Sequence, residues 1–426
     1  MRRLLGVFLA AVLSAATTSI HAQPVLRDGW PHDYGIPNTS SFVEPNPLSI
    51  AVTQDGVRLV VTATATTIRV YDIDGNELNS WAVSGTVPNP AGANYLCAGP
   101  NIGDLDGDGD LELVAALRSP TATTRAIAAF SLSGDILTGV TRGYAMGAGH
   151  IDISTVTLAD IDDDGADEVI YTAYDTLYAL NGDGSAAAGF PWPLNGQTHW
   201  VAGPVVVPGD DTHDPVIVWA TQNNQLHARS VGGMDELPGW PVGFTASADG
   251  YIAGPVIIPT ETGWIVSLCS TVGVNAWTDD GLVVAGFPMS LTNVDGVQIT
   301  SMSVADVDAD GSPDLLVKAS NDFLHAVGLD GAYLAGFPYS LQTNNGMRET
   351  ISAMRENSAS EALLFVASMT LTVGETQLFG LRNHSPLPGF PVDITTNENI
   401  PRIYTALFPP EDGILPIVVH SILGYT

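Results

Sequence analysis

Short apolar runs alternate with polar turns along most of the chain. Valine, isoleucine, leucine and threonine gather in runs of four to eight residues, and glycine, aspartate, proline and asparagine stand between the runs. This alternation is typical of many short β-strands joined by tight turns. Apolar positions at the spacing of a helix are scarce. The pattern predicts an all-β fold.

A four-residue phrase, in which glycine precedes an aromatic residue and proline, recurs between these runs. Its glycines are separated by 50, 47, 50 and 53 residues. A period near fifty is the length of one four-stranded blade of a β-propeller. We attribute the phrase itself to blade packing and turn formation. Its copies span residues 188–191, 238–241, 285–288, 335–338 and 388–391.

The repeat divides the chain into seven complete units and a partial one. The partial unit supplies only two strands, and Asp28-Gly29-Trp30-Pro31 near the other terminus repeats the unit-ending phrase. A blade shared by the first and last strands removes an unpaired sheet edge. We therefore expect residues 23–426 to form one propeller domain of eight four-stranded blades, closed by N- and C-terminal strands; seven blades with an additional tail is the alternative. The units begin near residues 42, 94, 148, 198, 249, 297, 347 and 399.

Three acidic stretches keep the same period and carry the candidate chemistry. Each places carboxylates at its first, third, fifth and ninth positions around a glycine turn and then enters an apolar strand. Like charges at this density repel one another at neutral pH unless a cation lies among them. The carboxylates are those of Asp104, Asp106, Asp108 and Glu112, of Asp160, Asp162, Asp164 and Glu168, and of Asp306, Asp308, Asp310 and Asp314.

Oxygen ligands alone at this spacing favour calcium. A main-chain carbonyl at the seventh position, from Asp110, Ala166 or Ser312, completes a flexible set for a hard ion, and no histidine or cysteine belongs to it. The glycine after the third carboxylate permits the turn around the ion. We expect one Ca²⁺ site in each of the three stretches. The two units between the second and third stretches keep only the remnants 208–214 and 259–263.

These loops, at this period, resemble the FG-GAP or VCBS-type repeats of integrin-alpha-like β-propellers and of many secreted bacterial proteins. In its periodicity the resemblance extends over essentially the whole mature chain, but only three units carry the full motif. It implies a bladed β-propeller with calcium in the loop between the first and second strands of a blade. Ala98-Gly99-Pro100 and its two counterparts match the words that name the family only loosely, so integrin-like ligand recognition does not follow.

The face opposite the acidic loops is the predicted ligand face. Alignment of the units places aromatic, basic, acidic and amide side chains at the start of the inner strands. Such groups bind sugars or peptides through stacking and hydrogen bonds, although they can equally plug a channel or link neighbouring blades. The candidates are Tyr95, His150, Asp152, His199, Trp200, Tyr251, Gln298, Arg348 and Arg402.

Composition narrows the class of partner. The chain has 14 Lys+Arg against 46 Asp+Glu, a formal net charge of −32, and Lys318 is its only lysine. Such a surface repels phosphate backbones and anionic lipid, which disfavours nucleic acid and membrane surfaces as partners. The two cysteines, Cys97 and Cys269, lie in apolar strands three units apart, so buried thiols are favoured over a disulfide.

The N-terminus has the form of a secretory signal peptide. Two arginines, an apolar run from Leu4 to Ala16 and small residues up to Ala22 match the three regions of such a peptide. The apolar run is short for a bilayer span. We expect residues 1–22 to be removed and the mature chain to be secreted, at the cell surface or in the periplasm, without inserting into a membrane.

These observations lead to one favoured function and an alternative. The favoured function is a secreted calcium-binding propeller that acts as a binding or adhesion module for an extracellular protein or glycan. The alternative is a polysaccharide lyase in which His150, His199, Tyr251 and Arg348 supply a base and neutralise a uronate. Familiar catalytic motifs are absent from the sequence, so its residues favour a binding module and lend an enzyme no direct support. A purely structural propeller is the third possibility.

Overall fold

The computed structural model describes the chain as β-strands arranged in a ring. Every regular element within the described residues is a β-strand, so this part of the chain holds no helix that could cross a lipid bilayer. The described residues are 11–16, 25–26, 48–63, 67–83, 96–118, 124–145, 156–173, 175–194, 203–210, 212–233, 235–246, 252–270, 273–292, 299–319, 322–341, 351–354, 361–369, 376–393, 402–407 and 414–422.

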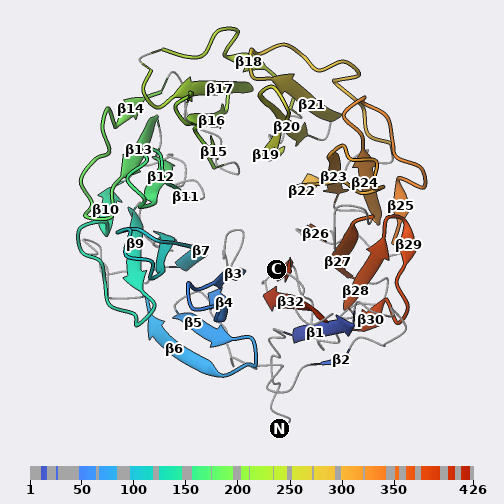
Figure 1. The fold of residues 1–426 in the computed structure, drawn as a ribbon, viewed down its shortest axis with the longest axis horizontal. Coiled ribbons are helices and arrows are strands. Elements are labelled where there is room, and N and C mark those ends of the chain that lie inside the picture. Colours follow the sequence, from blue (N-terminus) through green and yellow to red (C-terminus); the bar gives the residue numbers. More distant parts are fainter. Residues whose placement is uncertain are drawn as a thin grey trace.

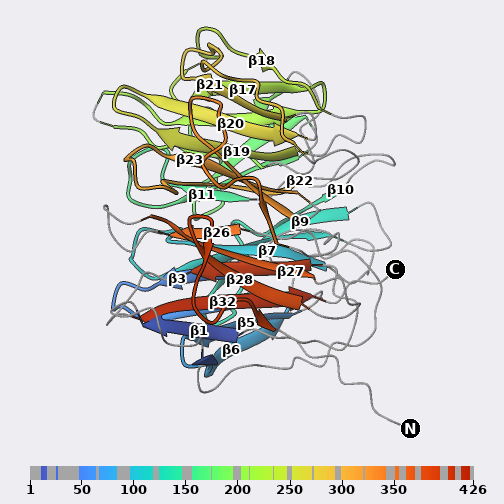
Figure 2. The same ribbon diagram turned by 90° about the vertical axis from the view of Figure 1, so that its right-hand side faces the viewer.

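Eight antiparallel sheets follow one another around a central axis in chain order, as Figure 1 shows. The first strand of each sheet lies nearest the axis and the later strands lie towards the rim. The ring is shallowest along this axis, which Figure 2 shows from the side. The arrangement confirms an all-β propeller, and the strands described group into eight blades rather than seven.

The first four blades lie close to the predicted repeat units. Blade 1 comprises β3 (Leu48–Val52), β4 (Arg58–Ala63), β5 (Thr67–Asp72) and β6 (Glu77–Ala82). Blade 2 comprises β7 (Leu96–Gly103), β8 (Glu112–Arg118), β9 (Thr124–Ser131) and β10 (Arg142–Ala145). Blade 3 comprises β11 (Thr157–Ala159), β12 (Glu168–Ala173), β13 (Thr176–Leu180) and β14 (Trp192–Pro193). Blade 4 comprises β15 (Val205–Val207), β16 (Val216–Thr221), β17 (Gln225–Ser230) and β18 (Val242–Gly243).

The remaining blades vary more in their outer strands. Blade 5 comprises β19 (Ile252–Pro259), β20 (Trp264–Ser270) and β21 (Gly273–Thr278). Blade 6 comprises β22 (Ile299–Ala305), β23 (Asp314–Ala319), β24 (Phe323–Val327) and β25 (Tyr339–Ser340). Blade 7 comprises β26 (Ile351–Met354), β27 (Leu363–Met369), β28 (Thr376–Arg382), β29 (Ser385–Pro386) and β30 (Val392–Asp393). Blade 8 comprises β31 (Arg402–Leu407), β32 (Ile414–Ile422), β1 (Ala11–Ala16) and β2 (Val25–Leu26).

Blade 8 contains strands from both ends of the chain, as predicted. Strand β1 pairs antiparallel with β32, from Ala11 opposite Val419 to Ala16 opposite Ile414, and β2 pairs with β1. Strand β1 lies within the predicted signal peptide, so in the full sequence this apolar run occupies the third position of the blade. The Asp28–Pro31 phrase that suggested the closure lies outside the described residues.

The hydrophobic core lies between neighbouring blades. In blades 3, 4 and 6 every residue of the second strand is buried, because these strands face an adjoining blade on both sides. One cluster joins Val61 of blade 1 to Leu113 and Phe130 of blade 2, and similar clusters join each successive pair as far as blade 7. Burial of a large apolar side chain contributes about 1.5–3 kcal/mol, so these interfaces stabilise the ring.

Two polar or reactive side chains are enclosed in this core. Lys318 in β23 is 0% exposed, and its Nζ donates a hydrogen bond to the Ala319 carbonyl over 2.6 Å. Cys269 in β20 is a free, buried thiol whose pKa is raised by burial. The prediction of a buried thiol is confirmed at Cys269. Cys97 lies in β7, where its side chain is outside the described part of the structure.

The repeated aromatic-proline phrase packs one blade against the next. Phe190, Trp240, Phe287 and Phe337 are all buried, and the peptide bond that follows each is cis. The glycine before the aromatic residue has a positive φ, which an L side chain adopts at a cost. A Cβ at Gly286 would lie 2.0 Å from the carbonyl oxygen of Asp330 in the next blade. The phrase is therefore structural, as its sequence suggested.

Candidate metal centres

The three acidic stretches form the loops between the first and second strands of blades 2, 3 and 6. Asp104 follows β7, Asp160 follows β11 and Asp306 follows β22. The second strand of each blade begins at or near the last carboxylate of the loop. The loops therefore have the position in the blade that the sequence resemblance implies.

In the blade 2 loop three carboxylates converge. Asp104, Asp106 and Asp108 each offer an oxygen, and the three oxygens lie within 4.8 Å of one another. Asp104 accepts hydrogen bonds from Gly107 N over 2.8 Å and Gly109 N over 2.9 Å. Both glycines have positive φ angles, which bring these N–H groups round to the first carboxylate.

The loops of blades 3 and 6 gather a slightly different set. In each of them the carboxylates of the first, third and ninth positions have oxygens within 4.8 Å of one another. The first carboxylate again accepts from the turn glycine: Gly165 N donates to Asp160, and Gly311 N donates to Asp306, both over 3.0 Å. The two sets are Asp160, Asp162 and Glu168, and Asp306, Asp308 and Asp314.

The ninth carboxylates join the loops to the core. Glu112, Glu168 and Asp314 are 8%, 1% and 4% exposed, and each accepts a hydrogen bond of 2.8–2.9 Å from the backbone N of the second loop residue. Burial, reinforced by the neighbouring loop carboxylates, raises the pKa of each to about 7, against the opposing effect of that hydrogen bond. Without a cation, the fold disfavours the ionised form of these groups.

This donor set fits a hard divalent cation. The gathered ligands are all oxygens, they carry several negative charges, and their mutual repulsion is the kind that a bound cation offsets. Calcium would be held in each loop by the first and third carboxylates with the fifth or ninth, and its charge would stabilise the ionised form of the buried carboxyl. Calcium itself remains a prediction of the sequence and the donor chemistry.

Other predicted ligands have different contacts in the structure. Asp164 and Asp310, at the fifth position, accept hydrogen bonds from the backbone N of the seventh residue, Ala166 over 2.9 Å and Ser312 over 2.7 Å. In blade 2 Asp110 N donates to Asp108 over 2.8 Å in the same way. The described loops thus bring together three carboxylates each, and the seventh-position carbonyls remain predicted ligands.

Asp167 is a residue that the sequence pattern overlooked. Its backbone N donates to the Asp104 carbonyl over 2.6 Å, and its carboxylate lies against Gly103, where a Cβ would approach it to 2.4 Å. Burial is the main cause of its raised pKa. Asp167 therefore links the loops of blades 2 and 3. It occupies the eighth loop position, where blade 2 has Leu111 and blade 6 has Pro313, so the alternation of ligand positions gave no signal for it.

The predicted ligand face falls almost entirely outside the described residues. Only Arg402 among its candidates lies in a described element, β31, and its side chain is not described. Both the ligand face and the lyase alternative therefore remain predictions. The positions outside the description are those of Tyr95, His150, Asp152, His199, Trp200, Tyr251, Gln298 and Arg348.

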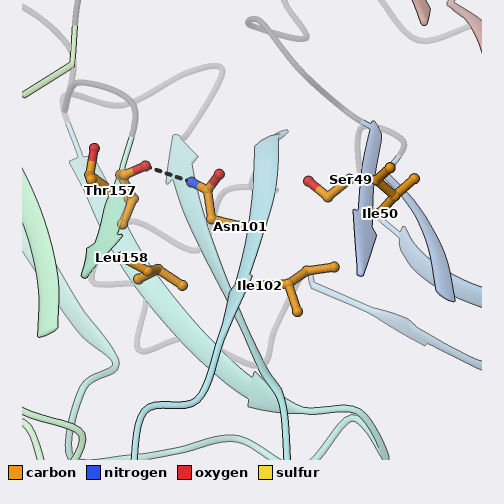
Figure 3. A pocket seen from close by; sticks show the side chains of 7 residues that line it. Ser49, Ile50, Asn101, Ile102, Thr157 and Leu158 are labelled. Carbon is orange, nitrogen blue, oxygen red and sulfur yellow. Dashed lines mark hydrogen bonds between the residues drawn. The ribbon is translucent and has the colours of Figure 1, made fainter. Parts of the chain in front are cut away.

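The described inner strands of blades 1 to 3 are linked by polar side chains. Ser49 in β3 donates to the Pro100 carbonyl, Asn101 in β7 to the Val156 carbonyl over 2.7 Å, and Thr157 in β11 to the Pro204 carbonyl over 2.6 Å. Figure 3 shows Ser49, Asn101 and Thr157 around a cavity of about 380 Å³. Each of these side chains reaches the next blade, so polar groups on these inner strands join neighbouring blades.

Comparison with known proteins adds likenesses of fold. Protein-family models give no match, and neither does a search of curated proteins. Among solved structures, the chain is similar to BamB from Moraxella catarrhalis at 14% identity and a TM-score of 0.48, over 89% of this chain and 98% of that one. It is also similar to BBS1N, crystallised in complex with ARL6DN, at 12% identity and a TM-score of 0.47, over 79% of this chain and 93% of that one. The Dos1 propeller is similar at 12% identity and a TM-score of 0.41, over 63% of each chain.

Proposed function

We propose that this chain is a calcium-binding β-propeller that works outside the cytoplasm as a binding or adhesion module for an extracellular protein or glycan. The observation that supports it is the convergence of carboxylate oxygens within 4.8 Å at the same place in three blades. Extracellular modules bind calcium at about 10⁻⁴–10⁻³ M, so the exterior would keep such sites filled. The N-terminal sequence, which has the form of a secretory signal peptide, supports export.

The role proposed for calcium is to hold the loops rigid. The first carboxylate of each loop already organises the turn through backbone N–H groups, and the ninth anchors it to the core. A cation among them removes the repulsion between carboxylates. Because Asp167 joins the loops of blades 2 and 3, order in one loop also favours order in the other.

Calorimetric titration of the chelator-treated protein with calcium tests the metal sites directly. We expect up to three binding events, one for each carboxylate group, and a rise in melting temperature that magnesium reproduces poorly because it requires a stricter octahedral geometry. An unchanged melting temperature in calcium would contradict the proposal.

The binding role needs a separate measurement. Calcium-loaded protein is applied to an array of glycans and extracellular matrix proteins, with the chelated protein as control, and any glycan ligand is incubated further to detect unsaturated uronide products. Binding without turnover supports a binding module. Calcium-dependent turnover would instead support the lyase alternative.

A further inference from the structure

A pocket of about 990 Å³ lies between blades 4 and 5, beside the loops that join the first and second strands. Blades 4 and 5 lie between two metal-loop blades, 3 and 6, and their own loops keep only remnants of the acidic motif. Pro208 follows β15 where Asp104 follows β7, and the connection from β19 to β20 covers only 260–263, whereas that from β7 to β8 covers 104–111. The connection in blade 5 is thus half as long as the metal loop of blade 2. We call this cavity the blade 4–5 pocket.

Much of the pocket wall is apolar. Trp264 at the start of β20 is half-buried, and its ring lies 5.8 Å from that of Trp240. Trp240 is held in place by its Nε1, which donates to the Asp279 carbonyl over 2.8 Å. The partly exposed indole therefore rests on a fixed support. The other apolar groups of the wall are Val207, Val216, Leu237 and Ile257.

The charges around this wall are almost all negative. Five carboxylates line the pocket and no lysine or arginine does; its one basic residue, His213, has Nδ1 within 3.1 Å of Asp210. Arg229, although it lies in β17, places its guanidinium over the Trp192 ring on the side of blade 3, at 4.0 Å. The five carboxylates are those of Asp210, Asp214, Glu261, Asp279 and Asp280.

An exposed apolar pair lies close in the chain to Asp280 of the pocket wall. Leu282 and Val283 are 65% and 56% exposed, the highest values among the large hydrophobic residues of the described chain. They follow Asp280 in the turn after β21. Adjacent exposed apolar side chains beside an apolar-walled pocket are a feature of protein-binding surfaces.

We propose that the blade 4–5 pocket binds a basic peptide segment of a protein partner, one in which an arginine or lysine is next to an apolar side chain. The apolar residue packs on the wall, and the cation lies over the Trp264 ring with the rim carboxylates around it. The pocket is at the upper end of the usual range for small ligands, about 300–1,000 Å³, which suits a peptide. The proposal is independent of calcium, because none of the three carboxylate clusters belongs to the pocket.

Fluorescence anisotropy with a short labelled peptide of alternating leucine and arginine tests this site on the full chain. The same peptide with citrulline in place of arginine removes the charge and keeps the shape. We expect the arginine peptide to bind and the citrulline peptide to bind at least about fivefold more weakly. The double variant Asp214→Asn/Glu261→Gln, which changes two exposed side chains, should weaken arginine-peptide binding by about two- to thirtyfold, since exposed ion pairs contribute about 0.2–1 kcal/mol each.

Asp55→Asn is the matched control, because Asp55 is an exposed carboxylate in the corresponding loop of blade 1. This variant should bind the arginine peptide as the wild type does. Failure of the wild type to bind, equal affinity for both peptides, or an equal effect of Asp55→Asn would overturn the proposal. Each titration is repeated in chelator and in calcium with calorimetry on the same samples, so loss of the metal sites is distinguished from loss of the peptide site.

Discussion

At the scale of single residues, the buried ninth carboxylates determine how the stability of the metal loops depends on pH and on a bound cation. Each accepts a backbone hydrogen bond at the junction between a loop and a second strand, where water is excluded. An ionised carboxylate there is costly without a counter-charge. A bound cation would supply that charge. The same carboxyl group would therefore destabilise the metal-free protein when it ionises and serve as a ligand in the metal-bound protein.

This arrangement predicts an unusual dependence of stability on pH. In the metal-free protein the folded state keeps Glu112, Glu168 and Asp314 protonated up to about pH 7, whereas the unfolded chain ionises them near pH 4. The folded state binds more protons in that window. The free energy of unfolding therefore falls as pH rises from about 4 to 7, by on the order of 3 kcal/mol for each group, and the loss is complete above pH 7.

Thermal melts of the chelated protein across this window measure the effect. Glu168→Gln cannot ionise and keeps an acceptor for the Ile161 N–H, so it should flatten the slope. His325 contributes in the opposite direction, because burial lowers its pKa to about 4 and only the unfolded state gains its proton between pH 6.5 and 4. Identical slopes for the wild type and the Gln variant would show that Glu168 is not protonated in the fold.

Removal of one charge from a loop should have different effects with and without metal. In chelator, Asp104→Asn relieves repulsion from Asp106 and Asp108, but its NH2 group cannot accept one of the two hydrogen bonds that the carboxylate receives from Gly107 N and Gly109 N. The two effects oppose each other, so we expect the stability of the metal-free protein to change by no more than about 1 kcal/mol. In calcium the same variant loses a ligand, and its melting temperature should fall below that of the wild type.

Asp163→Asn is the control for this difference between chelator and calcium. Asp163 lies in the blade 3 loop outside its carboxylate cluster and has a φ of 61°, a conformation that asparagine also adopts readily. Melting curves of both variants with and without calcium should change only for Asp104→Asn. A drop of equal size in both conditions would indicate a purely structural role for Asp104.

The position of these loops in their blades could be predicted from the sequence, because acidic residues and glycine recur at the same spacing in all three. Asp104, Asp160 and Asp306 begin the loops, and the glycine five residues later allows the turn. The inter-blade contact of Asp167 was not predictable, since it depends on which neighbouring loop approaches. The sequence also could not show whether the fifth or the ninth carboxylate joins the cluster, because both positions are acidic in all three loops.

At the scale of elements, the repeated glycine sets how closely blades approach one another. Gly286 has a φ of +92°, and a Cβ there would collide with the backbone of the next blade. We expect Gly286→Ala to cost about 1–2 kcal/mol for the left-handed conformation and about 1–3 kcal/mol more for the displaced backbone. Chemical denaturation measures the sum.

Gly189→Ala separates these two costs. Gly189 occupies the same position of the phrase in blade 3 with a φ of +84°, but nothing lies within 4 Å of a Cβ added there. Its substitution should show the conformational cost alone. If the two variants lost equal stability, close blade approach would not be the reason for glycine at Gly286.

Blade 8 gives a second prediction at this scale. Strand β32 is paired with β31 on one side and with β1 on the other. Removal of residues 1–22 by a signal peptidase would take β1 away. We expect amides of 414–422 to exchange hydrogen faster in a chain that begins at Gln23 than in one that begins at Met1, because an unpaired strand edge opens readily. Equal protection in the two chains would mean that another segment replaces β1.

The same region shows where element prediction from sequence reaches its limit. The approximate positions of the eight sheets could be predicted from the sequence, because turn phrases recur about once per blade. The run that forms β1 is rich in alanine, leucine and valine, a composition shared by the apolar region of a signal peptide and by a buried strand. Only pairing with β32, which lies about four hundred residues away in the chain, distinguishes the two in the structure.

At the scale of the whole molecule, the blades differ in what their equivalent loops do. Blades 2, 3 and 6 carry the carboxylate clusters, whereas blades 4 and 5 enclose the pocket proposed for a basic peptide. One repeated scaffold thus carries metal loops and a pocket along the same side of the ring. The sequence showed that two consecutive units keep only remnants of the motif, but only the fold showed that they enclose a pocket lined by a partly exposed tryptophan.

The enclosed Lys318 has a practical consequence for anyone who handles this protein. It is the single lysine of the chain and is 0% exposed, so the native protein offers amine-reactive reagents little besides the α-amino group of the N-terminus. Coupling through amines should therefore attach dyes or sensor surfaces in one orientation. The ε-amino group becomes available only when blade 6 opens, which makes acylation at this residue a built-in reporter of local unfolding.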